Sequence, residues 1–260
     1  MEPLLGFIIK IERRCDMDSK LLTVGAHRGA MCYAPENTIA AFALAIEQDC
    51  YRIEFDVRRT ADGHLIVMHD DAVDRTTDGS GLVSEMNLSE LKKLRSGTEL
   101  IPTLKESLDF MAGKVRMLIE QKEVGITEQI IREVELSKVV EECTIVSFHE
   151  EALVEARQIN PQIDRGFFII RPGVYNVEEI CERVDPSLLI VWPAAVKPEY
   201  IKKAVDKGIT VRCGFKDDQT MEQIKEHFQG LVELGVTEFS CGRPDWIKQL
   251  IREYNLMNFE

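Results

Sequence analysis

The chain has 260 residues, enough for one large domain or two small ones, and 45% of them are hydrophobic, as in ordinary globular proteins. Its 32 lysines and arginines stand against 45 aspartates and glutamates, and the net charge of −13 argues against nucleic acid or an anionic membrane as the main partner. The sequence contains no apolar run of about 18 residues, so we expect no membrane insertion.

The first half of the chain predicts two strands separated by a helix. Residues 1–20 are predicted to be an N-terminal appendage, and the apolar run 21–26 is the first strand. Residues 38–48 have apolar side chains at helical spacing, with Asn37 as the expected N-cap. Residues 51–57 alternate as a second strand, and a tight turn leads into a further extended piece. A polar excursion over about 70–101 is predicted to be a small insertion after this second strand.

The second half predicts a regular alternation of strands and helices. Six more strands are expected at residues 115–120, 144–148, 165–170, 188–191, 210–213 and 238–240. Apolar residues at helical spacing fill the segments between them, and a last helix is expected over 245–254. Alternation of this kind favours a parallel sheet. Eight strand–helix units within 21–260 favour an α/β fold of the (β/α)8 TIM-barrel type, in a single domain.

Seven cysteines are scattered along the chain, and no C-x-x-C pair occurs among them. A chain of this length does not need disulfide bonds to be stable, and the count is odd. Free thiols in a reducing compartment are therefore expected, which predicts a cytoplasmic location.

Three carboxylates stand at the ends of predicted strands. Glu54 and Asp56 lie two residues apart, so both project from the same face of their strand, while Glu120 ends the next strand of the barrel. Two acids so close are unfavourable unless a cation lies between them, and three oxygen ligands suit a hard divalent metal ion such as Mg²⁺ or Ca²⁺. The alternative, a surface strand with acids on its wet side, conflicts with a barrel strand that is covered on both faces.

Two histidines also end predicted strands, and two cations accompany them. His27 and His69 fit an acid and a base on either side of one reacting centre. Arg28 offers a planar fork for a phosphate group and Lys122 a point charge. Gly29 is expected to let the backbone approach the ligand.

The motifs that contain these residues resemble those of the glycerophosphodiester phosphodiesterase family. They are H-R-G from residue 27, P-E-N-T from 35, E-x-D from 54, the run D-G-x-x-x-x-x-H-D over 62–70, R-T-T-x-G-x-G, I-P-T-L, and E-x-K from 120. The resemblance spans roughly residues 24–244, and its first half is highly specific.

The resemblance implies a (β/α)8 barrel with a small insertion and one divalent metal ion on Glu54, Asp56 and Glu120. It also implies that His27 and His69 form the acid–base pair. Phosphate would contact Arg28 and Lys122, and Glu36 of P-E-N-T would lie beside the site without binding the metal.

The second half of the chain departs from the family pattern at two places. The family usually carries W-T-V-N on its seventh strand, where this chain has C-G-F-K from Cys213, and T-D-x-P near its end, where this chain has C-G-R-P from residue 241. The family's tryptophan supplies an apolar wall for the glycerol or alcohol group. Trp192, at the end of the sixth strand, is predicted to replace that wall, with a core position as the alternative.

We therefore predict a phosphoric diester hydrolase that releases glycerol 3-phosphate and an alcohol from small glycerophosphodiesters. Either water attacks directly, or the glycerol 2-hydroxyl attacks first through a cyclic phosphate. A non-catalytic barrel that binds phosphodiesters or a phosphorylated metabolite is an alternative, motivated by the two departures. A metal-dependent lyase would use the carboxylates but would not need His69. The sequence does not indicate an oligomeric state.

Overall fold

The structure is a computed structural model, and it describes residues 21–171 and 175–258. The predicted N-terminal appendage, residues 1–20, lies outside the described residues and stays a prediction.

Eight parallel strands close into a barrel, which confirms the predicted fold class. Around the barrel β1 pairs with β11 on one side and with β2 on the other, and β6 to β10 complete the ring. The barrel strands are β1 (Thr23–Ala26), β2 (Arg52–Arg59), β6 (Arg116–Gln121), β7 (Cys143–Ser147), β8 (Asp164–Ile169), β9 (Leu188–Val191), β10 (Thr210–Gly214) and β11 (Glu238–Cys241). Each lies within a few residues of a strand predicted from the hydrophobic pattern.

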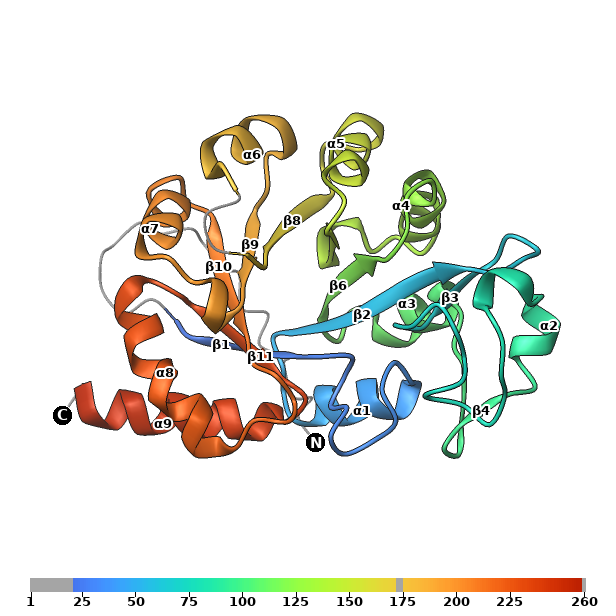
Figure 1. Ribbon diagram of the computed structural model, residues 1–260, viewed down its shortest axis with the longest axis horizontal. Coiled ribbons are helices and arrows are strands. Elements are labelled where there is room, and N and C mark those ends of the chain that lie inside the picture. The colour runs from blue at the N-terminus through green and yellow to red at the C-terminus, as the bar shows by residue number, and fades with distance from the viewer. Residues whose placement is uncertain (1–20, 172–174, 259–260) are drawn as a thin grey trace, which may run out of the picture.

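One helix follows each barrel strand, and the helices surround the barrel (Figure 1). Their apolar sides pack on the outer face of the sheet, as Ile130, Ile131 and Val134 of α4 do. The helices are α1 (Ile39–Glu47), α3 (Leu104–Met111), α4 (Thr127–Leu136), α5 (Glu150–Ile159), α6 (Val177–Val184), α7 (Pro198–Asp206), α8 (Met221–Leu234) and α9 (Pro244–Asn258). Short 3₁₀ turns, η2 (Val140–Glu142) and η3 (Pro193–Ala195), occur in the loops.

The predicted N-cap of α1 was wrong by one residue. Thr38 is the N-cap, and its side-chain oxygen accepts a hydrogen bond from the N–H of Ala41. Asn37 instead adopts a left-handed backbone conformation, with φ of 59°, and directs its side chain towards β2. Instead of capping the helix, the Asn37 side-chain amide donates a hydrogen bond of 2.8 Å to Asp56.

The region predicted as an insertion lies to one side of the barrel (Figure 1). Strand β3 (Leu65–Val67) pairs antiparallel with the end of β2, and is followed by η1 (Val83–Glu85), α2 (Leu88–Leu91), β4 (Arg95–Ser96) and β5 (Glu99–Leu100). These elements enclose a small apolar cluster of their own, made by Ile66, Met68, Val73, Val83, Leu91 and Ile101. The excursion is therefore a packed unit attached to β2.

Alternation along β2 separates the core from the site. Ile53, Phe55 and Val57 are fully buried in the core between strands and helices. Glu54 and Asp56 consequently face the barrel interior.

The barrel interior also holds a buried ion pair that the strand pattern did not predict. Nη1 of Arg212 lies 2.6 Å from Oε1 of Glu238, and both side chains are almost completely buried. Gly25 makes room for this arginine, because a Cβ atom there would lie 2.6 Å from Nη1. The charge of Arg212 is thus compensated inside the barrel, which a buried charge requires.

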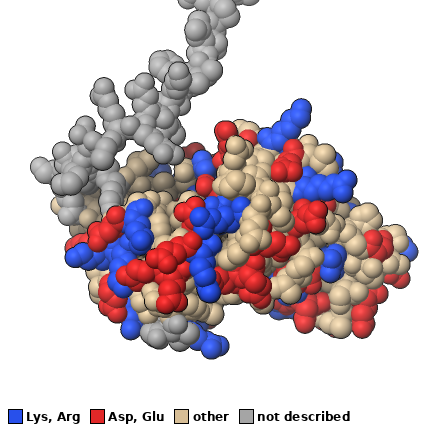
Figure 2. Space-filling model, turned by 90° about the horizontal axis from the view of Figure 1, so that it is seen from above, with Lys and Arg blue, Asp and Glu red and all other residues tan. Residues whose placement is uncertain are grey.

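On the face of the molecule shown in Figure 2, acidic and basic side chains are interspersed over the described surface. Among the described helices, none is long and apolar enough to span a membrane. All six cysteines within the described residues are free thiols.

Candidate active site

The three acids predicted as metal ligands meet at one point in the barrel mouth. Glu54, Asp56 and Glu120 each offer a carboxylate oxygen, and these oxygens lie within 4.8 Å of one another. Strand register produces the arrangement, because Asp56 of β2 pairs directly with Glu120 of β6. All three side chains are buried.

Two of the three carboxylates in this triad, Glu54 and Glu120, are destabilised in their ionised form when no cation is bound. Burial and the neighbouring Asp56 raise the pKa of Glu120 to about 8, and the same two causes raise the pKa of Glu54. Burial acts the same way on Asp56, but Lys122 and Arg28 hold its pKa below the usual value. Among the described residues, neither Oε1 of Glu54 nor Oδ1 of Asp56 has a hydrogen-bond partner, although both atoms are buried. Such oxygens fit a hard divalent metal ion.

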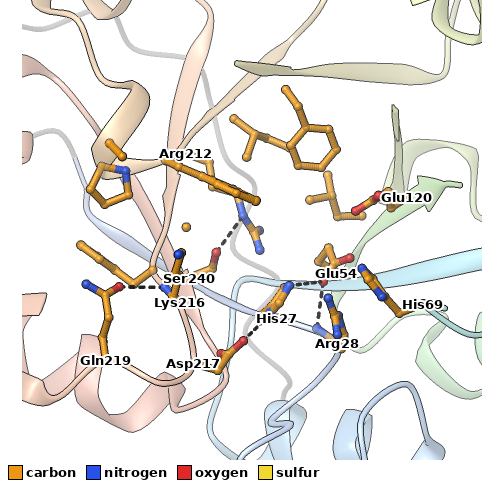
Figure 3. Close-up of a pocket in the computed structure, with 18 of the residues that line it drawn as sticks. His27, Arg28, Glu54, His69, Glu120, Arg212, Lys216, Asp217, Gln219 and Ser240 are labelled. Carbon is orange, nitrogen blue, oxygen red and sulfur yellow. Dashed lines mark hydrogen bonds and ion pairs between the residues drawn. The ribbon is translucent and has the colours of Figure 1, made fainter. Parts of the chain in front are cut away.

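His27 follows β1 and stands beside Glu54 of the triad (Figure 3). Its Nε2 lies 3.9 Å from Oε2 of Glu54, and its Nδ1 lies 2.7 Å from Oδ2 of Asp217. Burial opposes protonation, but Asp217 and Glu54 outweigh it and raise the pKa of the imidazole. Asp217 was not predicted from the sequence, because it comes from the loop after β10, 190 positions away.

His69 lies across the triad from His27 and is anchored by a chain of ion pairs. Its Nδ1 is 2.6 Å from Oδ1 of Asp70, and Arg75 binds that same carboxylate through Nε at 2.6 Å. Arg75 also binds Glu36, which in turn contacts Nη1 of Arg28 at 2.9 Å. Glu36 therefore lies beside the metal triad and ties Arg28 to the insertion. Sequence reasoning missed Arg75, whose motif gave no indication of its partner.

The two cations proposed for phosphate contact the acids in this structure. Nζ of Lys122 lies 2.6 Å from Glu120 and 3.4 Å from Asp56. The backbone N–H of Arg28 donates to Oε2 of Glu54 at 2.8 Å. Both side chains also line the pocket in front of the triad.

Gly29 has a packing role in addition to the one predicted for it, which stays a prediction. Its φ is +77°, and a Cβ atom there would lie 2.7 Å from the backbone carbon of Ala41 in α1. The glycine thus allows α1 to pack closely against the H-R-G loop.

A cavity of about 750 Å³ opens over the triad, and its far wall is apolar. Phe148 and Phe168 stack at 4.1 Å between ring centroids, and Phe148 is 39% exposed. Trp192 is 41% exposed and also lines the cavity. Ile190 of β9 and Phe215 complete the wall.

Position 213 does not face this cavity, contrary to our expectation that an aromatic residue there would form the wall. Cys213 is completely buried among the residues between barrel and helices, whereas Gly214 faces the cavity. A Cβ atom on Gly214 would lie 3.8 Å from the Trp192 ring. The Trp192 indole thus lies beside the end of β10, near the place where we expected a wall.

An acid triad, two histidines and two cations at the mouth of a (β/α)8 barrel define a class of barrel enzyme that acts on phosphate esters. A family model, the glycerophosphoryl diester phosphodiesterase family, matches residues 27–244. The chain belongs to this family.

Individual relatives agree with this assignment. A glycerophosphodiester phosphodiesterase from Caldanaerobacter subterraneus subsp. tengcongensis is 31% identical over 242 residues, which covers 88% of this chain and 97% of that one. A solved phosphodiesterase structure from Oleispira antarctica, in complex with the product sn-glycerol-3-phosphate, is 30% identical with a TM-score of 0.77 and covers 89% of this chain and 97% of that one. A glycerophosphodiester phosphodiesterase structure from Agrobacterium tumefaciens is 28% identical, with a TM-score of 0.75, and covers 87% of this chain and 99% of that one.

Proposed function

We propose that this protein hydrolyses glycerophosphodiesters to glycerol 3-phosphate and an alcohol, the reaction after which its family is named. The observation that carries the proposal is that Glu54 and Glu120 of the acid triad and both histidines line one cavity. The product complex of the Oleispira relative, which is 30% identical, supports the same substrate class.

Glu54, Asp56 and Glu120 would hold one divalent cation, Mg²⁺ or Ca²⁺. Their fit rests on two buried oxygens without hydrogen-bond partners among the described residues and on the raised pKa of Glu120, about 8. When bound, such a cation supplies positive charge that stabilises the phosphoryl oxygens in the transition state. In its absence Lys122 supplies part of this neutralisation, since its Nζ lies within 3.4 Å of two of the acids.

We assign the proton transfers to His27 and His69. One imidazole removes the proton from the attacking oxygen as a new P–O bond forms. The other gives a proton to the departing alkoxide as the old P–O bond breaks. Both rings have an aspartate on Nδ1, which leaves Nε2 of each ring for these transfers.

Arg28 and Lys122 would bind the phosphate oxygens. In this structure Arg28 pairs with Asp56 and Lys122 pairs with Glu120, and a bound phosphate would contact the same two cations. A planar guanidinium and an ammonium are both suited to this geometry.

We propose that the apolar wall receives the organic arm of the substrate. Trp192 and Phe148 expose ring surface to the cavity, although exposed aromatic side chains are otherwise unfavourable in water. A cavity of 750 Å³ is in the range that encloses ligands much larger than glycerol phosphate. The wall would therefore favour alcohols with apolar surface.

The free thiols, together with a reaction on small water-soluble diesters, fit a reducing compartment, and we propose the cytoplasm.

The test of function measures glycerol 3-phosphate release from glycerophosphocholine, glycerophosphoethanolamine and glycerophosphoglycerol, with Mg²⁺, with Ca²⁺ and with a chelator. We expect turnover with at least one metal and none with chelator. Binding of the diesters without turnover under every metal condition would instead favour a non-catalytic barrel. A ³¹P time course of the active sample separates the two routes, because attack by the glycerol 2-hydroxyl produces a transient cyclic phosphate.

A further inference from the structure

Asp217 stands on the side of His27 that faces away from the acid triad. Its Oδ2 lies 2.7 Å from Nδ1 of the imidazole, while Nε2 on the opposite edge of the ring faces Glu54 at 3.9 Å (Figure 3). The aspartate belongs to the loop between β10 and α8, and the histidine to the loop after β1. These loops are brought together because β1, β11 and β10 are neighbours in the barrel.

The segment after β11 fixes the position of Asp217. The backbone N–H of Gly242 donates a hydrogen bond to Oδ1. Nη1 of Arg243 donates to the backbone carbonyl oxygen of Asp217 at 2.7 Å. Within its own loop, the N–H of Lys216 donates to Oε1 of Gln219 at 2.8 Å. Asp217 is therefore held in place by hydrogen bonds to both its side chain and its backbone.

Gly242 provides the space that this carboxylate occupies. A Cβ atom at position 242 would lie 2.6 Å from Oδ1 of Asp217 and 2.7 Å from Cγ of Met31. Any residue other than glycine would displace the aspartate or its neighbours. Position 242 is also where the sequence departs from the T-D-x-P pattern of its family. At the position where the family pattern has an aspartate, this chain has Gly242, and the carboxylate of Asp217 from another loop lies against it.

We propose that Asp217 is the positioning residue for His27, and that Gly242 is glycine in this chain so that Asp217 can take this place. The inference rests on the proposed function only for the reaction that His27 performs. Asp217 accepts a hydrogen bond from Nδ1–H, which selects that tautomer and fixes the ring plane. Nε2 is then the atom that takes up or gives the proton, while Asp217 itself stays ionised.

The loss of this contact has a predictable chemical result. In Asp217→Asn the side-chain amide can donate to Nδ1, which favours a neutral imidazole with its proton on Nε2. That tautomer cannot accept a proton at Nε2, and in comparable triads the same change is strongly damaging. We expect kcat to fall by ~10²–10⁴-fold, with KM changed less than about threefold, because Asp217 contacts the histidine and not the substrate.

The experiment compares Asp217→Asn with Asp218→Asn in the full chain. Asp218 is the exposed neighbour in the same loop, so its variant removes the same charge nearby. Kinetics on glycerophosphocholine give kcat and KM, and thermal unfolding reports whether the barrel is intact. Protein labelled with ¹⁵N-histidine gives the His27 tautomer directly from ¹H–¹⁵N couplings, with His27→Ala to assign the signal. We expect a fixed Nδ1–H tautomer in the wild type and in Asp218→Asn, and its loss in Asp217→Asn.

Gly242→Ala tests the same contact without removing the carboxylate. It should reproduce the loss of kcat and of the tautomer. Asp217→Ala is measured alone and together with Gly242→Ala, and the double variant should be no worse than the poorer of these two single variants, since both changes act through one contact. Additive losses would overturn the inference, as would a wild-type kcat or an unchanged His27 tautomer in Asp217→Asn. The tautomer is read without substrate, so a failure of the proposed hydrolysis would leave this result intact and be distinguishable from it.

Discussion

Replacing Glu120 by glutamine should have opposite effects on the protein with and without metal. The substitution removes one of three buried carboxylates and keeps the shape of the side chain. Glutamine also keeps a carbonyl oxygen that can accept from Lys122, whose Nζ lies 2.6 Å from Oε1 of Glu120. The metal-free variant is therefore expected to fold like the wild type, while the metal-loaded form loses a ligand.

The size of the stability change expected for Glu120→Gln without metal follows from the pKa of Glu120. Burial and Asp56 raise it from 4.5 to about 8 in the folded protein. Each pKa unit corresponds to ~1.4 kcal/mol, so at pH 8 the ionised carboxylate costs the folded state up to about 4 kcal/mol. Because the pKa is higher in the folded state, ionisation of Glu120 costs no stability below its unfolded pKa of 4.5. The free energy of unfolding then falls as the pH rises from 4.5 towards 8. Glu120→Gln should match or exceed the wild-type melting temperature at pH 8, and the advantage should disappear near pH 4.5.

The magnitude with metal follows from mass action. A cation at 100 times its dissociation constant stabilises the wild type by ~2.7 kcal/mol, or roughly 5–11 °C for a domain of this size. Glu120→Gln should show less than a third of that shift at the same concentration, by scanning calorimetry with Mg²⁺, Ca²⁺ or chelator. A variant that is less stable than the wild type without metal, or that keeps the full metal shift, would refute the reasoning about the triad.

Three further predictions concern the acid–base pair, the apolar wall and the barrel interior. His27→Ala and His69→Ala should each lower kcat by ~10²–10⁴-fold, and a p-nitrophenyl diester should rescue whichever variant lost the acid; equal rescue of both would contradict separate roles. Trp192→Ala should raise KM by ~10–100-fold for diesters of apolar alcohols and little for glycerol diesters; identical kinetics across the series would exclude the wall. Arg212→Met should lower the free energy of unfolding by up to ~3–5 kcal/mol in urea titrations, because Glu238 loses its contact at 2.6 Å and keeps only the longer ion pair with Arg52, whose Nε lies 3.6 Å from Oε1. A loss below about 1 kcal/mol would contradict that account.

The fold could be predicted from sequence because its signals are local. Apolar runs separated by segments of helical periodicity report burial directly, and eight such units in one chain leave a closed barrel as the natural arrangement. The boundaries were also close, although Asn37 was assigned as a helix cap. Its real partner is Asp56, 19 positions away, and a contact of that kind overrides the local preference of asparagine for caps.

The acid triad could be predicted for a similar reason. Glu54 and Asp56 lie on one strand, where alternation alone places them on one face, and Glu120 ends the next barrel strand. Asp70 is adjacent to His69 in the chain, so its contact with that ring was within reach of the sequence. Where chemistry depends on neighbours along a strand or loop, sequence is sufficient.

The sequence by itself therefore determined the barrel, the acid triad and the two histidines, because periodicity and motif spacing act over short distances. The tertiary structure alone decided which carboxylate holds His27, that Phe148 and Phe168 line the cavity together with the predicted Trp192, and what fills the barrel interior. Asp217 reaches His27 across 190 positions, and Arg212 pairs with Glu238 across 26. The first contact arises because barrel closure makes β1 a neighbour of β11, and the second because the register of β10 and β11 places Arg212 opposite Glu238. No local pattern records them, because each residue's partner lies on another strand or in another loop.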